Sequence, residues 1–390
     1  MLNKSKKIKI LTNFVTLFLF IIEHDFENFN NKRKFITRND SIKAQNIEAF
    51  FKCNIKNYSI LIFEHNPYHY ECTPGFTKYF LDLGYNIDII MHRMGQDTFC
   101  LFENVEKIRL FIFDNFDKII DNSEKFSLVI HNYDYLLVES TNISGKEIYK
   151  KLGLFKMCNS IFVLHNVFYI KEMGISCYYN QKRIWSLAKF SNALQVNPHY
   201  FGNIKLKEKN NKTRFFITST FGRNNNYLIY VAEKLKKENL EFEIIVVGWS
   251  NSLSPEIIPK YLIKNFTFKY RVSYYELYQL VDSSDFIIIN LDPNNTNDNA
   301  YKNLKATGSA QLSYGFLKPA IINKNFASIY NMTPENSFIY DNSNFYKTLY
   351  DAINLNNSDY KQKQNNLMKL SNSIYNISLE NLKLSLKNIC

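Results

Sequence analysis

The chain has 390 residues and a mass of 46.2 kDa, which is too long for one ordinary hydrophobic core and fits two domains of roughly 150 to 200 residues. Its hydrophobic fraction of 46% excludes an intrinsically disordered chain. The six cysteines include no Cys-x-x-Cys pair, so the sequence predicts neither a zinc motif nor a disulfide framework. Reduced thiols and a cytoplasmic location are therefore expected.

The net charge of +12 is unevenly distributed along the chain. Residues 1–57 contain eleven Lys and Arg against five Asp and Glu, a net +6, so half of the excess lies in this segment. No basic run interleaved with aromatic residues follows residue 57, and the sequence therefore predicts no nucleic-acid partner.

The N-terminus combines four lysines within its first nine residues with an apolar stretch over residues 10–22. That stretch is too short to span a bilayer, which needs about 20 residues. Three interpretations of residues 1–24 stay open: a shallow anchor on the cytoplasmic face of an anionic membrane, a packed core segment, or a signal peptide. Residues 23–27 provide no small-residue cleavage site, and residues 28–57 are predicted to be a connector.

From residue 58 the pattern becomes one of alternating strands and helices. Residues 59–63 form a continuous apolar run, as expected of a strand buried on both faces. Thr73 is predicted to cap a helix that carries Pro74 in its first turn and ends at Gly84. A further strand over residues 87–91 completes a β-α-β unit, which implies a parallel sheet.

Two later apolar runs, over residues 127–131 and 161–165, are also predicted to be strands. Each ends in a His-Asn pair, at His131 and at His165. Polar residues just past the carboxyl end of a parallel strand occupy the usual ligand edge of such a sheet. Both histidines are therefore candidates to line a binding site.

The second half repeats the alternation after a predicted linker at residues 210–212. Strands are predicted over residues 214–219, 242–247, 266–269, 286–291 and 320–322, and helices over 227–237, 273–281 and 307–314. Ser273 and Glu276 form a capping box at one helix start. The predicted fold class is α/β, with two Rossmann-like parallel-sheet domains facing a cleft. The predicted parts are an N-terminal extension (1–57), a first domain (58–209), a second domain (210–359) and a polar helical tail (360–390).

An ordered series of short motifs in the second half resembles the nucleotide-sugar domain of GT-B glycosyltransferases. The series comprises residues 219–223, 246–248, 273–277, 283–286, 307–310 and 314–321. The resemblance covers about 150 residues of the second half, and more loosely the first strand, loop and helix of the first half. It implies a GT-B fold that uses a UDP- or GDP-linked sugar as substrate and needs no further cofactor.

The donor of such an enzyme carries a diphosphate, which an arginine and the backbone N–H groups of a helix N-terminus can hold. Arg223, beside Gly222 at the end of a strand, is the leading candidate to bind the diphosphate. A surface arginine with no ligand is the simpler interpretation. Three residues at a helix start are candidates for the same ligand, or for plain capping: Thr307, Gly308 and Ser309. The resemblance implies base and ribose contacts for Gly248 and Arg271.

The sequence departs from the resemblance at the positions where many retaining members carry two glutamates. Counting back from Pro319, Leu304 and Leu312 occupy these positions, which puts the retaining subgroup in doubt. The single carboxylate of residues 290–293 is not an Asp-x-Asp pair of the kind that holds Mn²⁺ or Mg²⁺. We therefore expect no required metal.

An inverting enzyme needs a general base in its first domain to deprotonate the acceptor hydroxyl. The loop after the first strand is rich in polar side chains, and His69 and Glu71 are the candidates for that base. Tyr68 and Tyr70 offer faces on which a sugar ring can stack. His65, His131 and His165 are further acceptor-side candidates, and an exposed rigid turn is the alternative interpretation of the loop.

The sequence thus favours a glycosyltransferase that moves a sugar from a nucleotide-sugar to a glycan or lipid-linked acceptor, as in surface polysaccharide or glycoconjugate assembly. Two alternatives stay open. One is a nucleotide-sugar epimerase on the same fold, and the other is a non-catalytic binding protein with a degenerate transferase fold.

Overall fold

The structure is a computed structural model, and it describes residues 42–66, 69–103, 105–143, 145–190, 193–219, 226–248, 253–341 and 343–389. The segment for which an anchor, core packing and a signal were considered, residues 1–24, lies outside the described residues. Among the described residues, no helix combines the length and the apolar character needed to cross a membrane.

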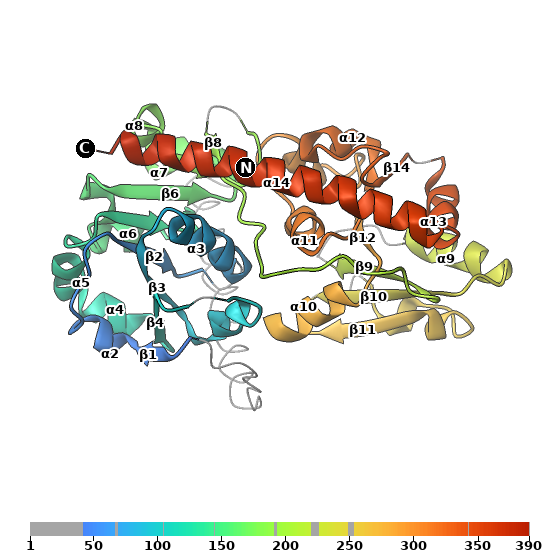
Figure 1. Cartoon of the computed structure of the whole chain (residues 1–390), viewed down its shortest axis with the longest axis horizontal. Coiled ribbons are helices and arrows are strands. Elements are labelled where there is room, and N and C mark those ends of the chain that lie inside the picture. The colour runs from blue at the N-terminus through green and yellow to red at the C-terminus, as the bar shows by residue number, and fades with distance from the viewer. Residues whose placement is uncertain are drawn as a thin grey trace, which may run out of the picture. The chain divides into compact units, whose positions relative to one another are not determined.

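Two parallel β-sheets organise the described part of the chain (Figure 1). The first has eight described strands, in the spatial order β1 (Ala44–Asn46), β4 (Ile108–Phe113), β3 (Asn86–His92), β2 (Ser59–Glu64), β5 (Tyr135–Val138), β6 (Ser160–Leu164), β7 (Ile184–Ser186) and β8 (Leu194–Gln195). The second has six, in the order β11 (Phe266–Tyr270), β10 (Phe242–Gly248), β9 (Thr213–Ser219), β12 (Phe286–Ile289), β13 (Ala320–Asn323) and β14 (Phe338–Tyr340). The predicted fold class, α/β with two Rossmann-like domains, is confirmed.

Helices connect the strands, as parallel pairing requires. Those of the first domain are α2 (Ile47–Phe50), α3 (Thr73–Asp82), α4 (Asp117–Asp121), α5 (Ser123–Ile130), α6 (Lys146–Lys151), α7 (Ile170–Met173) and α8 (Ser176–Asn180). Those that follow are α9 (Asn226–Lys237), α10 (Tyr274–Asp282), α11 (Gly308–Phe316), α12 (Lys324–Ala327), α13 (Phe345–Ile353) and α14 (Asn357–Lys387). The predicted strands and helices of the second half all appear within one to three residues of their expected bounds.

The strand prediction for residues 127–131 is wrong, because these residues form the end of helix α5 and the helix-capping His131. Phe126 and Ile130 lie four positions apart, so a helix places both on one face, and both are fully buried. The strand comes later, as β5. A short apolar run can be a buried strand or one face of a helix, and periodicity alone does not separate them.

The connector prediction for residues 28–57 is also wrong where the structure describes them. Residues 44–46 form β1, which pairs in parallel with β4. In α2, the side chains of Ile47 and Phe50 are buried in the core that contains Phe111 of β4 and Phe126 of helix α5. This part of the predicted extension therefore belongs to the first domain.

One predicted helix cap is displaced by a residue. Cys72 holds the N-cap position of α3, and Thr73 is its first helical residue, followed by Pro74 as predicted. The hydroxyl of Thr73 donates to the carboxylate of Glu139 at 2.8 Å instead of capping the helix. At α10 the predicted cap is confirmed, because the N–H of Glu276 donates to Ser273 Oγ.

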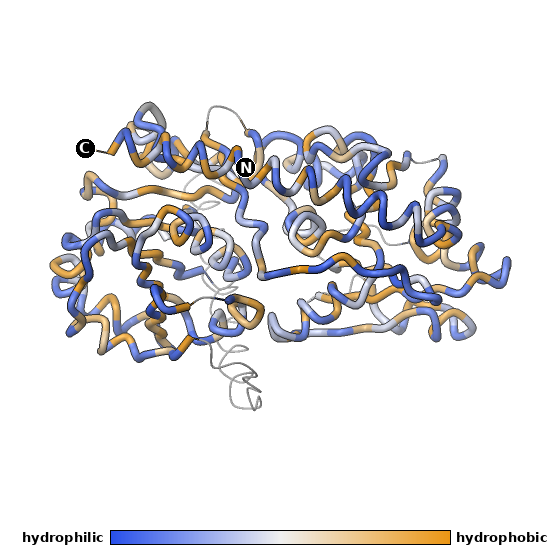
Figure 2. The backbone as a smooth tube through the Cα atoms, in the orientation of Figure 1, coloured by the Kyte–Doolittle hydropathy of each residue, from blue (hydrophilic) through white to orange (hydrophobic). Residues whose placement is uncertain are grey.

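The C-terminal helix α14 packs against both domains. Leu367 and Ile374 join the hydrophobic core on one face of the second sheet, whereas Leu382 and Leu386 join a core of the first sheet. Along α14 the tube in Figure 2 changes repeatedly between hydrophobic and hydrophilic colours, as expected of a helix with one buried face. The predicted polar tail is thus a single helix that contributes to both cores.

Two glycines let one connecting segment pass close to both domains. A Cβ on Gly75, in α3, would overlap with the backbone of Pro198, and a Cβ on Gly315, in α11, would overlap with the carbonyl oxygen of His199. Neighbouring residues of one segment therefore contact a helix of each domain. Only glycine allows backbone to approach this closely.

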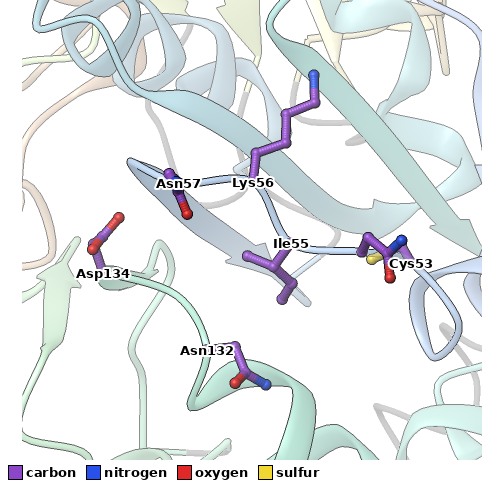
Figure 3. A pocket seen from close by; sticks show the side chains of 7 residues that line it. Cys53, Ile55, Lys56, Asn57, Asn132 and Asp134 are labelled. Atoms are coloured by element: carbon purple, nitrogen blue, oxygen red, sulfur yellow. The ribbon is translucent and has the colours of Figure 1, made fainter.

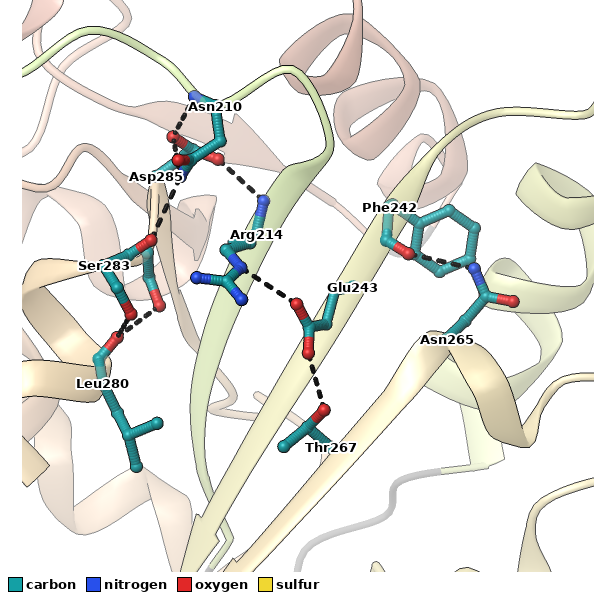
Figure 4. Close-up of polar contacts among 10 residues, drawn as sticks. Asn210, Arg214, Phe242, Glu243, Asn265, Thr267, Leu280, Ser283 and Asp285 are labelled. Atoms are coloured by element: carbon teal, nitrogen blue, oxygen red, sulfur yellow. Dashed lines mark hydrogen bonds and ion pairs between the residues drawn. The ribbon is translucent and has the colours of Figure 1, made fainter. Parts of the chain in front are cut away.

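The predicted linker is anchored at the amino end of the second sheet (Figure 4). The buried carboxylate of Asp285 accepts hydrogen bonds from the backbone N–H groups of Asn210 and Arg214, at 2.9 and 2.7 Å, and from the side-chain amide of Asn210 at 3.0 Å. These bonds hold the start of β9 beside the start of β12.

Candidate active site

Polar residues follow three neighbouring strands of the first sheet at the edge where those strands end. Glu64 is the last residue of β2, Glu139 and Ser140 come directly after β5, and His165 comes directly after β6. Because β2, β5 and β6 are adjacent and parallel, their carboxyl ends meet at one edge, the usual ligand edge of such sheets.

Two of these residues form a pair of buried carboxyl groups. The Ser140 hydroxyl donates to Glu64, and the Thr73 hydroxyl donates to Glu139. Burial raises the pKa of Glu64 to about 8. Burial, followed by the charge of Glu64, raises the pKa of Glu139 well above its ordinary value. Desolvation disfavours the charged form of each group, so burial favours the protonated form of both carboxyl groups.

Two histidines stack beside this acid pair. The rings of His69 and His165 are 3.7 Å apart between centroids, and the Ser140 hydroxyl lies 3.4 Å from His165 Nε2. Burial, followed by repulsion from His69, holds the pKa of His165 well below its ordinary value. His165 is therefore neutral, and its flat ring supports the more exposed His69.

Glu71 extends from this edge to the second domain. It lies in the short 3₁₀ helix Tyr70–Cys72, and its Oε1 is 3.9 Å from His69 Nδ1. Its Oε2 accepts a hydrogen bond from the hydroxyl of Tyr274, the first residue of α10, at 3.3 Å. A Cβ placed on Gly308 would lie 4.0 Å from Glu71 Oε1. The predicted base and the predicted phosphate-binding helix start therefore lie next to each other.

That helix start belongs to α11, as the sequence predicted. Thr307 holds the N-cap position without a side-chain capping bond, and its backbone N–H donates to the hydroxyl of Tyr330 at 3.3 Å. The Ser309 hydroxyl is 3.0 Å from the Thr218 hydroxyl, near the carboxyl end of β9. The first N–H groups of a helix have no partner within it and favour an anion.

Four buried polar atoms around this edge have no hydrogen-bond partner among the described residues: Tyr70 Oη, Glu139 Oε1, His65 Nδ1 and Gln311 Nε2. The charges of Glu64 and Glu139 add to burial in raising the pKa of Tyr70, which places its hydroxyl near the acid pair. Gln311 lies on α11, and its Oε1 accepts from the Cys72 thiol at 3.8 Å. An unpaired buried polar atom costs about 1–3 kcal/mol, so water or a ligand is expected to meet these groups.

Two other histidine candidates lie in different surroundings. His65 Nε2 is 3.0 Å from the hydroxyl of Tyr149 in α6, and burial lowers the pKa of His65 to about 4. His65 therefore helps to hold α6 against the ligand edge. His131 is exposed at the end of α5, which leads to the amino end of β5, so the structure places it at the opposite edge from His165.

The candidate donor-binding residues that the structure describes in β10 and after β11 lie at the carboxyl edge of the second sheet. Gly248 is the last residue of β10 and pairs with Ser219 of β9 and Tyr270 of β11. Arg271 follows β11 directly, with a φ of 53°. Three further candidates, Tyr68, Gly222 and Arg223, lie outside the described residues. Arg223 nevertheless belongs to the segment that directly follows β9.

Sequence reasoning missed three participants in this arrangement. Glu64 directly follows the apolar run of residues 59–63, so a carboxylate at the end of a buried strand was a usable signal. Glu139 was hidden by the wrong strand prediction for residues 127–131. Tyr274 had no signal, because its contact with Glu71 joins residues 203 positions apart.

The two leucines at the glutamate positions have structural roles. Leu312 is buried in a core of the second domain, and the carbonyl of Leu304 accepts a hydrogen bond from the N–H of Val167 at 2.9 Å. Within the described ranges, no group of three or more His, Cys, Asp or Glu side chains is arranged to hold a metal ion.

The structure thus consists of two parallel α/β domains. The carboxyl edge of the first sheet carries acidic and histidine side chains, and the start of helix α11 in the second domain lies beside it. No protein-family model matches the sequence, and no curated protein matches it. A glycosyltransferase from Rickettsia africae ESF-5 is similar in structure, at 16% identity and a TM-score of 0.53, over 86% of this chain and 99% of that chain.

Two further solved structures are similar at lower TM-scores. The E. coli heptosyltransferase WaaC with ADP is 11% identical over 72% of this chain and 92% of its own, with a TM-score of 0.42. A UDP-glucose: anthocyanidin 3-O-glucosyltransferase in complex with UDP is 11% identical over 86% and 99%, with a TM-score of 0.46. The chain has the GT-B fold, and its resemblance to GT-B glycosyltransferases is confirmed at the level of fold.

Proposed function

We propose that this protein is a glycosyltransferase that moves a sugar from a nucleotide-sugar donor to a glycan or lipid-linked acceptor. The observation that carries the proposal is the position of Glu71. A carboxylate from the first domain lies beside the N-terminus of α11 and bonds to Tyr274 of the second domain. A proton acceptor and an anion-binding helix start are the two groups that sugar transfer from a diphosphate requires.

On the donor side, the diphosphate is proposed to bind the backbone N–H groups of Gly308 and Ser309 together with Arg223. Gly248 and Arg271 are proposed to contact the base and ribose. Arginine and a helix N-terminus neutralise the leaving diphosphate, so we propose that no metal ion is required.

On the acceptor side, Glu71 or His69 is proposed to take the proton of the attacking hydroxyl. The acceptor oxygen then forms a bond to the anomeric carbon, while the bond between that carbon and the diphosphate breaks and its electron pair leaves with the diphosphate. Glu64 and Glu139 are poor candidates for this base because both are buried, which raises their pKa values and favours their protonated forms.

Calorimetric titration with UDP-, GDP- and CMP-sugars tests donor binding, and slow release of free sugar without acceptor identifies the donor. Glu71→Gln is expected to retain donor affinity and to lower turnover by about 100-fold or more, the usual contribution of a general base. Glu147→Gln, which removes an exposed carboxylate from α6, is the matched control. Absence of binding to every donor by a folded protein would favour a non-catalytic binding protein.

One observation favours an epimerase as the second candidate. An epimerase must move a proton at a sugar carbon, and the buried pair of Glu64 and Glu139 places two acids at the ligand edge of the first sheet. In heavy water, an epimerase would incorporate deuterium into the donor sugar without any acceptor. A glycosyltransferase would leave the carbon-bound hydrogens of the donor unchanged.

The location proposed for the protein is the cytoplasm, with peripheral contact to the inner face of the membrane through residues 1–24. The net charge of +6 over residues 1–57 supports this contact, since basic segments are attracted to anionic lipid. A membrane location would also bring the enzyme to a lipid-linked acceptor.

A further inference from the structure

A polar hollow of about 560 Å³ lies at the amino edge of the first sheet, opposite the edge that carries Glu71 (Figure 3). It is bounded by residues 53–57, which lead into β2, and by Asn132 and Asp134, which precede β5. In Figure 3 the side chains of Asn57 and Asp134 point into the space between the two loops, whereas Lys56 points away from it. The hollow is thus separated from the proposed active site by the length of strand β2.

The groups that face the hollow retain hydrogen-bonding capacity. Asp134 Oδ2 accepts from the N–H of Ser59 at 2.7 Å, and its second oxygen accepts no bond from any described residue. The amide N of Asn132 donates to the carbonyls of Leu128 and Val129 at 3.0 and 3.3 Å, and its oxygen has no partner among the described residues. The side-chain amide of Asn57 has no partner among the described residues. One carboxylate and two amides are therefore available to a ligand.

Three tyrosines stand at the same amino edge of the sheet, next in the chain to residues that line the hollow in the case of Tyr58 and Tyr135. Tyr85, Tyr58 and Tyr135 lie at the starts of β3, β2 and β5, which are neighbours in the sheet, and the register pairs Ser59 with Asn86 and Ile60 with Tyr135. The rings of Tyr85 and Tyr135 meet edge to face at 5.7 Å. Burial, followed by the interactions of Tyr85 with Tyr135, Asp134 and Tyr58, raises the pKa of Tyr85 to about 12.

Tyr58 is the most unusual of the three tyrosines. Its ring is 75% exposed, the largest exposed fraction among the large hydrophobic side chains of the described residues. Its backbone has a φ of 53°, the left-handed region that is unfavourable for an aromatic residue. The fold thus holds a large aromatic ring in water on a strained backbone, whose carbonyl accepts a hydrogen bond from the N–H of Asn86 at 2.7 Å. Backbone strain of this kind clusters at functional sites.

The combination of groups points to one class of ligand. Sugar rings present flat C–H faces that pack on tyrosine rings, and neighbouring hydroxyls that donate to carboxylates and bond to amides. An anionic ligand is disfavoured because the carboxylate of Asp134 faces the hollow and Lys56 points away. The chemistry therefore matches a neutral oligosaccharide better than a nucleic acid or an anionic lipid.

We propose that this hollow and these three tyrosines form a second, non-catalytic binding site for a neutral oligosaccharide. Tyr58 provides the stacking face, and Asp134 and Asn57 bind the hydroxyls. The site would retain a glycan chain on the protein independently of donor binding at the opposite edge of the sheet. The inference stands on the amino-edge geometry alone and does not require the proposed transferase activity.

Saturation-transfer NMR on the full chain tests the proposal, with maltotriose, cellotriose and chitotriose as the probes. At least one trisaccharide is expected to bind saturably, and Tyr58→Gly is expected to weaken that binding by about 10-fold or more, as loss of a stacking ring would. Glycine adopts a φ of 53° without strain, so this variant should melt no lower than the wild type. Asn57→Ala should weaken binding less.

Tyr261→Ala removes another exposed tyrosine, from the second domain, and should leave trisaccharide binding unchanged. Donor titrations with the Tyr58→Gly variant should match those with the wild type, whether or not the transferase proposal is correct. The proposal is overturned if none of the three sugars binds. It is equally overturned if Tyr58→Gly binds them like the wild type, since the sugar would then occupy another site.

Discussion

The buried carboxyl group of Glu64 makes the stability of this protein depend on pH in a direction that can be measured. Burial raises its pKa to about 8 in the folded protein, from an ordinary value of 4.5. Between these two pH values the folded state holds a proton that the unfolded state has lost. The free energy of unfolding must therefore fall as pH rises through this window, and the contribution of Glu64 becomes constant above pH 8.

The size of the effect follows from the displacement of the pKa. Each unit of pH within the window lowers the free energy of unfolding by up to about 1.4 kcal/mol, and the full displacement corresponds to roughly 5 kcal/mol. Glu64→Gln replaces the protonated acid with a neutral group of nearly the same shape. Its oxygen can accept from the N–H of Asn66, and its amide can donate to Ser140 Oγ. The variant should match the wild type near pH 4.5 and exceed its stability above pH 8.

Urea unfolding followed by circular dichroism, at several pH values from 4.5 to above 8, measures this difference. Subtracting the two proteins cancels contributions of groups that do not interact with Glu64, such as that of His65, whose pKa is lowered to about 4. The difference reports Glu64 together with its effect on Glu139, because the charge of Glu64 contributes to raising the pKa of Glu139. Glu147→Gln controls for removal of a negative charge at an exposed position. Parallel pH profiles for wild type and Glu64→Gln would refute the reasoning, because Glu64 would then titrate alike in both states.

Five further outcomes are expected. Arg223→Ala should weaken donor affinity in calorimetry more than acceptor affinity, and unchanged donor affinity would contradict its role; His69→Ala should reduce turnover with donor binding retained, unless Glu71 alone is the base. Gly315→Ala should lower the free energy of unfolding in urea by more than about 2 kcal/mol, since its Cβ would overlap with the His199 carbonyl. Asp285→Ala should lower it by about 3 kcal/mol, since it leaves buried N–H groups unpaired, and a neutral effect would refute the anchoring role. Removal of residues 1–24 should shift the protein from the membrane fraction to the soluble one, and an unchanged distribution would argue against an anchor.

Local patterns in the sequence determined most of the architecture. The apolar run at residues 59–63, the proline in the first turn of α3 and the capping serine at 273 act through neighbours within a few positions. The local structure that they favour can therefore be predicted from the sequence without knowledge of the fold. The same signals, taken in order, predicted parallel sheets and placed His69 and Glu71 after the first strand.

The tertiary structure determined whether short segments with a weak local preference form strands or helices. Residues 127–131 read equally well as a strand or as a helix face, and burial of Phe126 and Ile130 on the sheet selected the helix. Residues 44–46 have no strand signal of their own and pair only because β4 offers an open edge. In both cases long-range packing outweighs a weak local preference.

In the candidate active site, too, the sequence and the tertiary structure determine different properties. The sequence by itself determined which chemical groups stand at the strand ends and helix starts. Only the folded chain decided which of them meet: the buried pairing of Glu64 with Glu139, the stacking of His69 on His165 and the bond from Tyr274 to Glu71. These contacts join residues far apart in the chain, and the pKa values they produce depend on exclusion of water by the whole fold.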